Sequence, residues 1–246
     1  PMTLPDMRFD VTAPATPLAD LGRVHLIAIG GAGMSAVARL LLARGVSVSG
    51  SDAADGPALQ ALRTLGARVH LGHDAGHLAG VDTVVVSSAI REDNVELAAA
   101  RAAGLRVLHR SQALASLMAG SRRVAVAGAN GKTTTTSMLV VSLDAAGAHP
   151  SYACGAEIAQ LATNAAIGDG SVFVVEADES DGSFLAYRPD VAVVTNVQPD
   201  HLDFYGTAER VEEAYAAFVA TVPADGLVVA CFDDPGSRRL AQAVRS

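Results

Sequence analysis

Large and positively charged side chains are scarce in this sequence of 246 residues. Tryptophan is absent and aromatic residues make up only 4% of the chain, so alanine, valine and leucine must fill the interior. Hydrophobic residues nevertheless reach 50%, which is ample for a core, and the length suits one large or two ordinary domains. Basic residues number 18 against 26 acidic ones, for a net charge of −8. This deficit argues against a nucleic-acid-binding protein, because such proteins present a basic face.

Cysteine and long apolar runs are also scarce. Cys154 and Cys231 have no metal-binding spacing, and we expect two buried free thiols in a reducing compartment. No uninterrupted apolar run approaches the roughly 20 residues needed to cross a bilayer, so no membrane association is predicted. The first 20 residues contain four prolines and no apolar signal-peptide core. We therefore predict a flexible N-terminal lead-in over 1–21 and a cytoplasmic location.

The most informative stretch runs from Val124 to Thr136 and reads VAVAGANGKTTTT. A short apolar strand over 124–127 meets a glycine loop, and a lysine and four threonines then begin a helix that we expect to reach Ala146. In this arrangement, backbone N–H groups and a helix N-terminus cradle the phosphates of a nucleotide. The predicted ATP-binding residues are Gly128, Ala129, Asn130, Gly131, Lys132, Thr133 and Thr134.

The match to a phosphate loop is close but not strict. Val126 stands at the position of the first glycine in the pattern GxxxxGK[ST], so the motif is the shorter GxxGKTT. An ordinary strand-to-helix turn with a solvated lysine is the alternative interpretation. We favour the phosphate loop, since glycine, glycine, lysine and threonine follow one another in the required order at a strand–helix junction.

A second glycine turn lies near the beginning of the chain. An apolar strand over 24–29 precedes Gly30-Gly31-Ala32-Gly33, and a helix over 34–44 and a strand over 46–49 lead to Asp52. This order resembles a dinucleotide-binding unit, in which a phosphate group lies at the helix N-terminus. Ala28 replaces the first glycine of the strict GxGxxG pattern, and glycines that serve only close helix–strand packing remain the alternative.

Strands and helices alternate through the first half of the chain. The further strands are predicted over 67–70, 83–86 and 105–108, and the helices over 57–65, 94–103 and 111–118. Repeated βα units of this length form a Rossmann-like, doubly wound parallel sheet that binds ligands at the carboxyl ends of its strands. We therefore expect Gly30–Gly33, Ser51-Asp52 and Ser87–Ile90 to meet in one crevice. Gly120-Ser121 is the predicted seam between this domain, 22–120, and a second α/β domain of the phosphate-loop type, 121–246.

Acidic and histidine side chains follow two strands of the second domain. A strand over 171–175 is followed by Glu176 and by three more carboxylates up to Asp181, and a strand over 191–195 leads to His201. Magnesium prefers oxygen ligands, so Glu176 and Thr133 are candidate ligands of an ATP-bound Mg²⁺. His201 is either a ligand of a second metal ion or a polar surface residue. Asp178 and Asp181 are expected to lie in a solvated turn, and a short strand over 151–153 is expected to lead into an irregular stretch up to Gly170.

Six stretches together carry a resemblance to a known family. They are HLIAIGGAGMSAVARLLLARGVSVSGSD, VVVSSAI, HRSQAL, VAVAGANGKTTTT, EADESDGSF and VVTNVQPDHLDFYG. In this order they resemble the Mur ligases, and most closely the branch that joins L-alanine to UDP-N-acetylmuramate, over nearly everything from Val24 onward. The chain departs from the family pattern at Ala28 and Ala36, where glycine is usual, and at Ala129 and Asn130 in the phosphate loop.

The resemblance implies an ATP-dependent, amide-forming ligase of peptidoglycan precursor synthesis, with ATP and Mg²⁺ as cofactors. The lactyl carboxylate of UDP-N-acetylmuramate would attack the γ-phosphate of ATP, and the amine of L-alanine would then displace phosphate from the acyl phosphate. The implied catalytic residues are Lys132 at the γ-phosphate, Glu176 with Thr133 on one Mg²⁺, and His201 on a second. The implied UDP-sugar contacts are Gly30, Gly31, Ala32, Gly33, Met34, Ser35, Asp52, Ser87, Ser88 and Ala89. The residues expected near the muramoyl group are Asn130, Ser180 and Asp181.

Members of this family have three domains, and this chain stops at Ser246 inside the second. We therefore expect an N-terminal fragment that binds UDP-N-acetylmuramate but turns over little on its own. A ligase that joins a whole tripeptide to the same nucleotide sugar is the nearest alternative. A NAD-dependent oxidoreductase, suggested by Gly30–Gly33 and Asp52, and a non-catalytic UDP-sugar-binding protein are alternatives from other classes.

Overall fold

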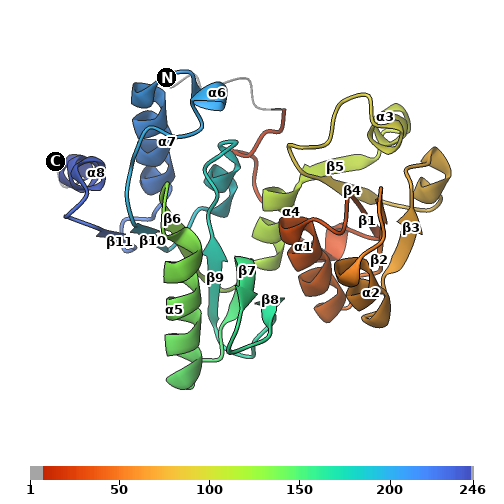
Figure 1. Cartoon of the computed structure of the whole chain (residues 1–246), viewed down its shortest axis with the longest axis horizontal. Helices are drawn as coiled ribbons and strands as arrows, with labels where there is room; N and C mark the ends of the chain where they lie inside the picture. The colour runs from red at the N-terminus through yellow and green to blue at the C-terminus, as the bar shows by residue number, and fades with distance from the viewer. Residues whose placement is uncertain (1–7, 245–246) are drawn as a thin grey trace.

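Hydrophobic strands from the two halves of the chain form two separate sheets, and each sheet is the centre of an α/β unit (Figure 1). The structure is a computed structural model that describes residues 8–244. The expected fold class, a doubly wound parallel sheet followed by a second α/β sheet with a phosphate-loop-type turn, is confirmed.

The first sheet has five strands in the order β3-β2-β1-β4-β5, and all of its strand pairs are parallel. Its strands are β1 (Val24–Ile27), β2 (Val48–Asp52), β3 (Arg68–Leu71), β4 (Thr83–Val86) and β5 (Arg106–His109). Its helices are α1 (Ala32–Ala43), α2 (Pro57–Thr64), α3 (Val95–Ala102) and α4 (Arg110–Leu117), with short 3₁₀ helices η1 (Leu18–Asp20) and η2 (Ala75–Leu78). The strand order reverses between β1 and β4, and ligands of this topology bind in the crevice at such a reversal.

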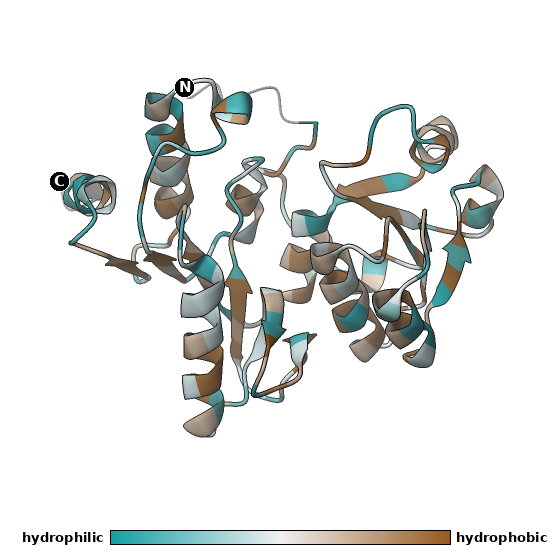
Figure 2. Cartoon of the chain, viewed as in Figure 1, coloured by the Kyte–Doolittle hydropathy of each residue, from teal (hydrophilic) through white to brown (hydrophobic). Residues whose placement is uncertain are grey.

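Strand β1 shows why its sequence is a continuous apolar run. All four of its residues are buried. Leu26 packs into the hydrophobic cluster formed with α1, α2 and α4, whereas the next residue, Ile27, packs on the opposite face with Val84, Val86 and Leu97. Figure 2 shows a similar concentration of hydrophobic residues along strands of both sheets. Helices thus cover both faces of the first sheet, as the alternation of strands and helices predicts.

The second sheet has six strands in the order β11-β10-β6-β9-β7-β8. Its strands are β6 (Arg122–Ala127), β7 (Ser151–Ile158), β8 (Thr163–Ala166), β9 (Val172–Glu176), β10 (Val191–Val194) and β11 (Leu227–Ala230). Its helices are α5 (Lys132–Ala145), α6 (Leu202–Tyr205), α7 (Ala208–Ala220) and α8 (Pro235–Val244), with the 3₁₀ helix η3 (Ser183–Tyr187). The strand pairs are parallel except for β7 with β8, so this sheet is mixed.

The β7–β8 hairpin is where the sequence-based expectation was wrong. We expected a strand over 151–153 and an irregular stretch to Gly170, whereas β7 continues to Ile158 and β8 pairs with it in antiparallel fashion. The residues of β8, Thr-Asn-Ala-Ala, show little hydrophobic pattern. Strand formation depends strongly on the neighbouring strand, and here pairing with β7 stabilises a strand that the local sequence does not predict. The other predicted strands and helices lie where expected, with ends shifted by a few residues.

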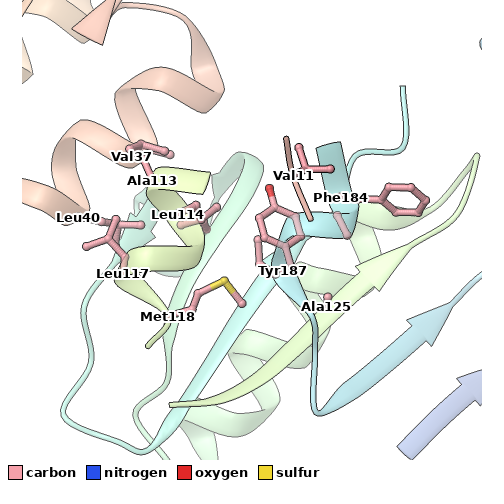
Figure 3. Close-up of a cluster of buried hydrophobic side chains, with 14 of the residues drawn as sticks. Val11, Val37, Leu40, Ala113, Leu114, Leu117, Met118, Ala125, Phe184 and Tyr187 are labelled. Carbon is pink, nitrogen blue, oxygen red and sulfur yellow. The ribbon is translucent and has the colours of Figure 1, made fainter. Parts of the chain in front are cut away.

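The two sheets share one hydrophobic core. Leu114, Leu117 and Met118 of the first half lie in the same buried cluster as Ala125 and Tyr187 of the second (Figure 3). Met118 and Ala125 are fully buried. Because protein interiors are close-packed and transmit strain, this shared core fixes the ligand-binding edge of one sheet relative to that of the other.

Residues 8–21 pack against the folded chain, and in this they differ from the flexible lead-in expected over 1–21. The first seven residues of that expected segment lie outside the described part. Val11 is only 2% exposed, and the Arg8 guanidinium donates to the backbone carbonyl oxygen of Ile90 at 2.6 Å. The prolines of this stretch oppose regular structure, but they do not prevent its few apolar side chains from being buried.

The two cysteines differ in exposure. Cys154 is buried, as expected, but Cys231 is exposed, so the expectation of two buried thiols is wrong for Cys231. Cys231 directly follows β11, an edge strand on which Leu227 and Val229 are 52% and 45% exposed. Across residues 8–244, no helix has both the length and the apolar character needed to cross a membrane.

Candidate active site

The turn after β1 adopts a glycine-type conformation although the first glycine of the motif is replaced. Ala28 has a φ of +59°, in the left-handed region that favours glycine. A Cβ atom on Gly30 would lie 2.3 Å from Leu59 and 2.9 Å from Asp52. The backbone N–H of Gly30 donates to the Asp52 carboxylate at 2.9 Å and ties the ends of β1 and β2 together. Close packing therefore accounts for Gly30, while the next residue, Gly31, begins helix α1.

Helix α1 begins without a side-chain cap. Gly31 is its N-cap residue and has no side chain to accept hydrogen bonds from the first N–H groups of the helix. Such N–H groups, together with the helix dipole, form a site suited to an anion such as a diphosphate. Met34 and Ser35 are buried, so among the predicted UDP-sugar residues on this helix Ala32 and Gly33 are the accessible ones.

The other predicted UDP-sugar residues lie at the carboxyl ends of strands beside β1. Asp52 ends β2, and Ser87, Ser88 and Ala89 follow β4. Ser88 and Ala89 are exposed, and the Ser88 hydroxyl donates to the carboxylate of Asp181 in the second half of the chain. The structure thus brings these residues to one edge of the sheet, and their contacts to a UDP-sugar stay predictions.

Arg110 is a residue of this edge to which the sequence analysis assigned no role. It directly follows β5, and a Cβ atom on Gly33 would lie 2.8 Å from its Nη1 atom. Its Nη2 atom donates to Asp178 Oδ2 at 2.9 Å. A basic residue at the carboxyl end of a strand, in a chain of net charge −8, is the signal that could have identified it.

Two glycines shape the loop after β6. Gly128 has a φ of +143°, and a Cβ atom there would lie 1.9 Å from the Thr195 hydroxyl, so no larger residue fits. Gly131 has a φ of +82° and is the N-cap residue of α5. The backbone carbonyl of Asn130 accepts hydrogen bonds from Thr195 Oγ1 at 2.7 Å and from the Asn196 amide at 2.8 Å. The loop is therefore fixed from the end of β10, with the N-terminus of α5 directly behind it.

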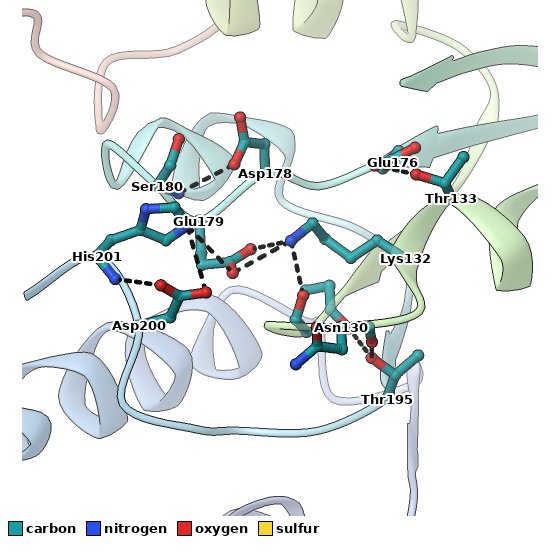
Figure 4. Close-up of polar contacts among 12 residues, drawn as sticks. Asn130, Lys132, Thr133, Glu176, Asp178, Glu179, Ser180, Thr195, Asp200 and His201 are labelled. Atoms are coloured by element: carbon teal, nitrogen blue, oxygen red, sulfur yellow. Dashed lines mark hydrogen bonds and ion pairs between the residues drawn. The ribbon is translucent and has the colours of Figure 1, made fainter. Parts of the chain in front are cut away.

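Lys132, the only lysine in the sequence, is held at the start of α5 by two acceptors (Figure 4). Its ammonium group donates to the carbonyl oxygen of Gly128 at 2.8 Å, and it lies 2.9 Å from Oε2 and 3.2 Å from Oε1 of Glu179. Glu179 is 1% exposed, and burial raises the pKa of its carboxyl although Lys132 acts in the opposite direction. Glu179, which the sequence analysis did not single out, thus pairs with the ammonium group that would contact a phosphate bound at this loop.

Thr133 and Glu176 supply the oxygen atoms predicted to hold Mg²⁺. The Thr133 hydroxyl donates to Glu176 Oε1 at 2.9 Å, and the Gly155 backbone N–H donates to Oε2 at 2.6 Å. A hydroxyl and a carboxylate side by side are hard oxygen ligands, so this donor set fits the ion. Among residues 8–244, no group of three or more His, Cys, Asp or Glu side chains could hold a metal ion. Phosphate oxygens and water would have to complete the coordination, which is how Mg²⁺ is usually bound with nucleotides.

His201 faces the same region from the loop after β10. Its Nε2 atom lies 4.0 Å from Glu179 Oε1 and 3.9 Å from Asp200 Oδ2, and its side chain is 35% exposed (Figure 4). Its φ of +51° is left-handed, which is uncommon for a residue other than glycine and frequent at functional sites. This position is compatible with the ligand role, which stays a prediction.

Asp178 and Asp181 do not lie in the solvated turn that we expected. Asp178 pairs with Arg110, and Asp181 Oδ2 lies 3.4 Å from Nε2 of the buried His109 while Oδ1 accepts from the backbone N–H of Ser183 at 3.0 Å. Burial opposes ionisation of Asp181, but the contacts with His109 outweigh it and hold the pKa of this carboxyl well below its usual range. Both oxygens of Asp181 contact other residues of the protein, and its position near a muramoyl group stays a prediction.

One cavity of about 430 Å³ lies between the two halves. Gly33 and Arg110 line it from the first half, and Lys132, Glu176 and His201 line it from the second. Its size is within the range of small-molecule sites. The three predicted catalytic residues therefore line the same cavity as Gly33 of α1, the helix that follows the first glycine turn.

A separate cluster of titratable groups lies around Glu96 at the start of α3. The fully buried Glu96 carboxylate accepts from the Ser51 hydroxyl at 2.5 Å and lies 2.8 Å from His77 Nδ1, 2.9 Å from His73 Nδ1 and 3.4 Å from His25 Nε2. Burial opposes ionisation, but the hydrogen bonds from these groups outweigh it and lower the pKa of Glu96 to about 2. The cluster fixes Ser51, which precedes the predicted UDP-sugar residue Asp52.

Known proteins resemble the chain over nearly its whole length. Residues 23–122 match the family profile described as Mur ligase family, catalytic domain, and residues 126–246 match the profile described as Mur ligase middle domain. A UDP-N-acetylmuramate–L-alanine ligase from Arthrobacter sp. (strain FB24) is 60% identical over 93% of this chain and 49% of its own length. The ligase of the same name from Renibacterium salmoninarum is 61% identical over 92% of this chain and 48% of its own length. The chain thus spans about half the length of the curated relatives it matches.

Solved structures of similar proteins have the same fold. The UDP-N-acetylmuramate:L-alanyl-gamma-D-glutamyl-meso-diaminopimelate ligase from Neisseria meningitides matches with a TM-score of 0.85 at 29% identity, over 91% of this chain and 75% of that one. The UDP-N-acetylmuramate–alanine ligase from Thermotoga maritima matches with a TM-score of 0.79 at 30% identity, over 89% of this chain and 51% of that one. Both ligase activities that the sequence left open are therefore represented among the similar structures.

Proposed function

Since the chain belongs to the Mur ligase family, we propose that it forms the UDP-sugar-binding and ATP-binding parts of an ATP-dependent ligase that joins L-alanine to UDP-N-acetylmuramate. The identity of 60% to a ligase with this activity supports the choice of substrates. A NAD-dependent oxidoreductase is disfavoured, because it would leave the Lys132 loop and the Thr133–Glu176 pair without a role. We place the reaction in the cytoplasm, where ATP and nucleotide sugars are available.

The observation that carries this proposal is the shared cavity. Gly33 and Arg110 from one half meet Lys132, Glu176 and His201 from the other around it. A nucleotide sugar whose diphosphate lies at the N-terminus of α1 would extend its acid group into this space, and the γ-phosphate of an ATP bound at the second loop would enter from the opposite side. The two reacting groups would therefore meet between the halves.

In the proposed reaction the carboxylate oxygen of the muramoyl lactyl group attacks the γ-phosphorus of ATP, and the bond to the β,γ-bridging oxygen breaks to release ADP. The amine of L-alanine then attacks the acyl carbon, and inorganic phosphate leaves as the amide forms. Lys132 neutralises charge on the γ-phosphate, and the N–H groups at the start of α5 hold the phosphate oxygens. Gathering several negative charges is the main obstacle, so the role of these residues is charge neutralisation and alignment.

The donor sets described above would hold the metal ions. Thr133 and Glu176 would hold one Mg²⁺ and His201 would hold a second, and bound Mg²⁺ supplies positive charge to the phosphate oxygens and the substrate carboxylate. The Gly155 N–H keeps Glu176 Oε2 in place, which leaves the Oε1 side of that carboxylate directed at Thr133. His201, whose backbone is left-handed, lines the cavity.

Phosphate release by the protein as its gene encodes it, with each substrate omitted in turn, tests this function. We expect release only when ATP, Mg²⁺, UDP-N-acetylmuramate and L-alanine are all present. Without L-alanine, added hydroxylamine should trap the acyl phosphate as a hydroxamate of the nucleotide sugar. Phosphate release that does not require UDP-N-acetylmuramate would contradict the proposal.

The tripeptide-adding activity is the second candidate, because the similar structure with a TM-score of 0.85 has that activity in its name. The same assay separates the two candidates when L-alanine is compared with L-alanyl-γ-D-glutamyl-meso-diaminopimelate as the acceptor. The proposal predicts turnover with L-alanine and little with the tripeptide. The reverse preference would move the protein to the other branch of the family.

A further inference from the structure

One loop after β9 contacts both predicted binding sites. Glu176 at the end of β9 and the three carboxylates of this loop, Asp178, Glu179 and Asp181, are directed to two different places. Glu176 and Glu179 contact Thr133 and Lys132 of the phosphate loop. Asp178 and Asp181 contact the first half of the chain, where their partners are Arg110 and, for Asp181, Ser88 and His109.

Hydrogen bonds within the loop keep these carboxylates in a fixed relation. The Ser180 N–H donates to Asp178 Oδ1 at 3.1 Å, and the Gly182 N–H donates to the backbone carbonyl of Glu179 at 3.0 Å. The hydroxyl of Tyr205 donates to the same carbonyl. Asp178 and Asp181, whose contacts fix the loop to the first half, are the two anchors of the loop. Because of the hydrogen bonds within the loop, these anchors also hold Glu179 in place.

Binding of ATP at the phosphate loop has to disturb Glu179. Lys132 must turn from this carboxylate toward the γ-phosphate, and Glu179 is only 1% exposed. Among the described residues, its Oε2 atom has no hydrogen-bond partner besides the close approach of Lys132. A buried carboxylate that loses its cation is strongly unfavourable, so ATP binds well only if Glu179 can move with the loop.

The partners of the two anchors, Arg110 and Ser88, are groups that a UDP-sugar would also contact. Arg110 adjoins Gly33 at the start of α1, so a diphosphate bound there would compete with Asp178 for the guanidinium. Ser88 belongs to the predicted UDP-sugar residues after β4, and its hydroxyl donates to Asp181. Occupation of the first site would therefore weaken both contacts that fix the loop.

We propose that Asp178 and Asp181 are positioning residues that couple the two sites, so that the UDP-sugar and ATP each strengthen the binding of the other. This inference rests on the proposed function. In the free protein the anchored loop keeps Glu179 on Lys132. The UDP-sugar contacts Arg110 and Ser88 in place of Asp178 and Asp181, which releases the loop. Lys132 then becomes available to the phosphates of ATP. Lys132 then engages ATP fully when the acceptor carboxylate is also in place.

Calorimetry with a non-hydrolysable ATP analogue, with and without saturating UDP-N-acetylmuramate, tests the coupling. In the wild-type protein we expect the sugar nucleotide to lower the Kd of the analogue by about 5- to 50-fold, and the analogue to lower the Kd of the sugar nucleotide by the same factor. Asp181→Asn removes the charge at the anchor. It should bind the analogue several-fold more tightly without sugar nucleotide, and the coupling factor should fall to about one.

Two further variants distinguish coupling from damage to the fold. Ser88→Ala removes the same contact from the other side and should also reduce the coupling factor. Asp190→Asn alters a carboxylate that accepts from the Arg123 N–H at 2.7 Å, remote from the loop's anchors, and should keep the wild-type factor. Weaker analogue binding by Asp181→Asn under both conditions would indicate a merely structural role and overturn the proposal.

The remaining outcomes separate this inference from the proposed function. Binding of both ligands to the wild-type protein with a coupling factor of about one would overturn the coupling and leave the proposed ligase function intact. An unchanged factor in Asp181→Asn and Ser88→Ala would do the same. Failure of the wild-type protein to bind either ligand would overturn the proposed function, and the coupling with it.

Discussion

The two glycine turns have the same strand–turn–helix architecture but obtain positive charge from different places. In the turn after β6 the cation is Lys132, part of the turn's own motif. In the turn after β1 the basic group is Arg110, which belongs to α4 and meets the turn only in the folded chain. A local motif therefore reveals the cation of the second site and only the backbone of the first.

The comparison extends to the acidic partners. Arg110 pairs with Asp178 and Lys132 pairs with the adjacent residue, Glu179. One loop thus neutralises the cations of both sites in the free chain. This arrangement would allow a chain with 26 acidic and 18 basic residues to bind the two anionic ligands proposed for it. The necessary cations are kept at the sites, and each is paired with a carboxylate that a phosphate can replace.

The largest predicted effect separates the two turns through their cations. Lys132→Met should lower kcat on the order of 10²–10³-fold, because it removes the charge that stabilises the transferred phosphate. The affinity for UDP-N-acetylmuramate, measured by calorimetry without ATP, should not fall, since Lys132 contacts Gly128 and Glu179 rather than the predicted UDP-sugar residues. A loss of UDP-N-acetylmuramate affinity as large as the loss of turnover would contradict two separate sites.

The next effect concerns the first turn alone. Gly30→Ala places a Cβ atom 2.3 Å from Leu59 and 2.9 Å from the Asp52 carboxylate, so it should displace the turn and weaken UDP-N-acetylmuramate binding by roughly 10-fold. Binding of an ATP analogue alone should be unchanged. Gly56→Ala is the matched control, since a Cβ atom there meets nothing within 4 Å. Equal effects of the two substitutions would show that the turn does not contact the nucleotide sugar.

The Glu96 cluster should make the stability of the protein sensitive to acid. The folded-state pKa of about 2 lies below the ordinary value of 4.5, so ionised Glu96 stabilises the fold above pH 4.5, and this stability is lost as the pH falls toward 2. The difference corresponds to about 3 kcal/mol. Glu96→Gln should lower the free energy of unfolding in urea at pH 7 by about this amount and flatten its decline between pH 4.5 and 2.

An exposed carboxylate of the second half provides the control for Glu96. Glu212 pairs with Arg239 and its side chain is 50% exposed, so Glu212→Gln should change the free energy of unfolding by less than about 0.5 kcal/mol. If the two glutamine variants were equally stable across the same pH range, the histidine cluster would have no special part in stability.

The smallest predicted effect concerns Ala28 and Ala36, two alanines of the first half at positions where the sequence analysis expected glycine. Ala28→Gly should stabilise the protein by roughly 0.5 kcal/mol, because relief of a left-handed alanine, about 1–2 kcal/mol, exceeds the entropy that glycine adds to the unfolded chain. Ala36→Gly lies inside α1 and should destabilise by about 1 kcal/mol. Thermal unfolding measures both changes, and shifts of the same sign would contradict the strain assigned to Ala28.

Local patterns predicted most of the fold. Strand β4 and the part of β6 that leads to Gly128 are continuous buried runs, so their sequences alone indicate parallel strands covered on both faces. Strand β8 was missed because its pairing with β7 determines it. The burial of Val11 was missed for a similar reason, since its partners lie far along the chain.

The same division applies to the candidate site. Lys132 and Thr133 lie within one motif, and Glu176 ends a strand, so each could be identified locally. Arg110 and Glu179 gain their importance only from their neighbourhoods in the folded chain, where residues more than forty positions apart come into contact. An acidic run looks like a solvated turn in sequence, and only the fold shows that its members bridge two sites.

The most direct test of two separate sites is a calorimetric titration of UDP-N-acetylmuramate into protein already saturated with Mg²⁺ and a non-hydrolysable ATP analogue. Two cradles around one cavity predict that the sugar nucleotide binds without displacing the analogue, so that both ligands occupy the same chain. Competition, with UDP-N-acetylmuramate expelling the analogue or failing to bind in its presence, would mean that the two turns do not form distinct sites.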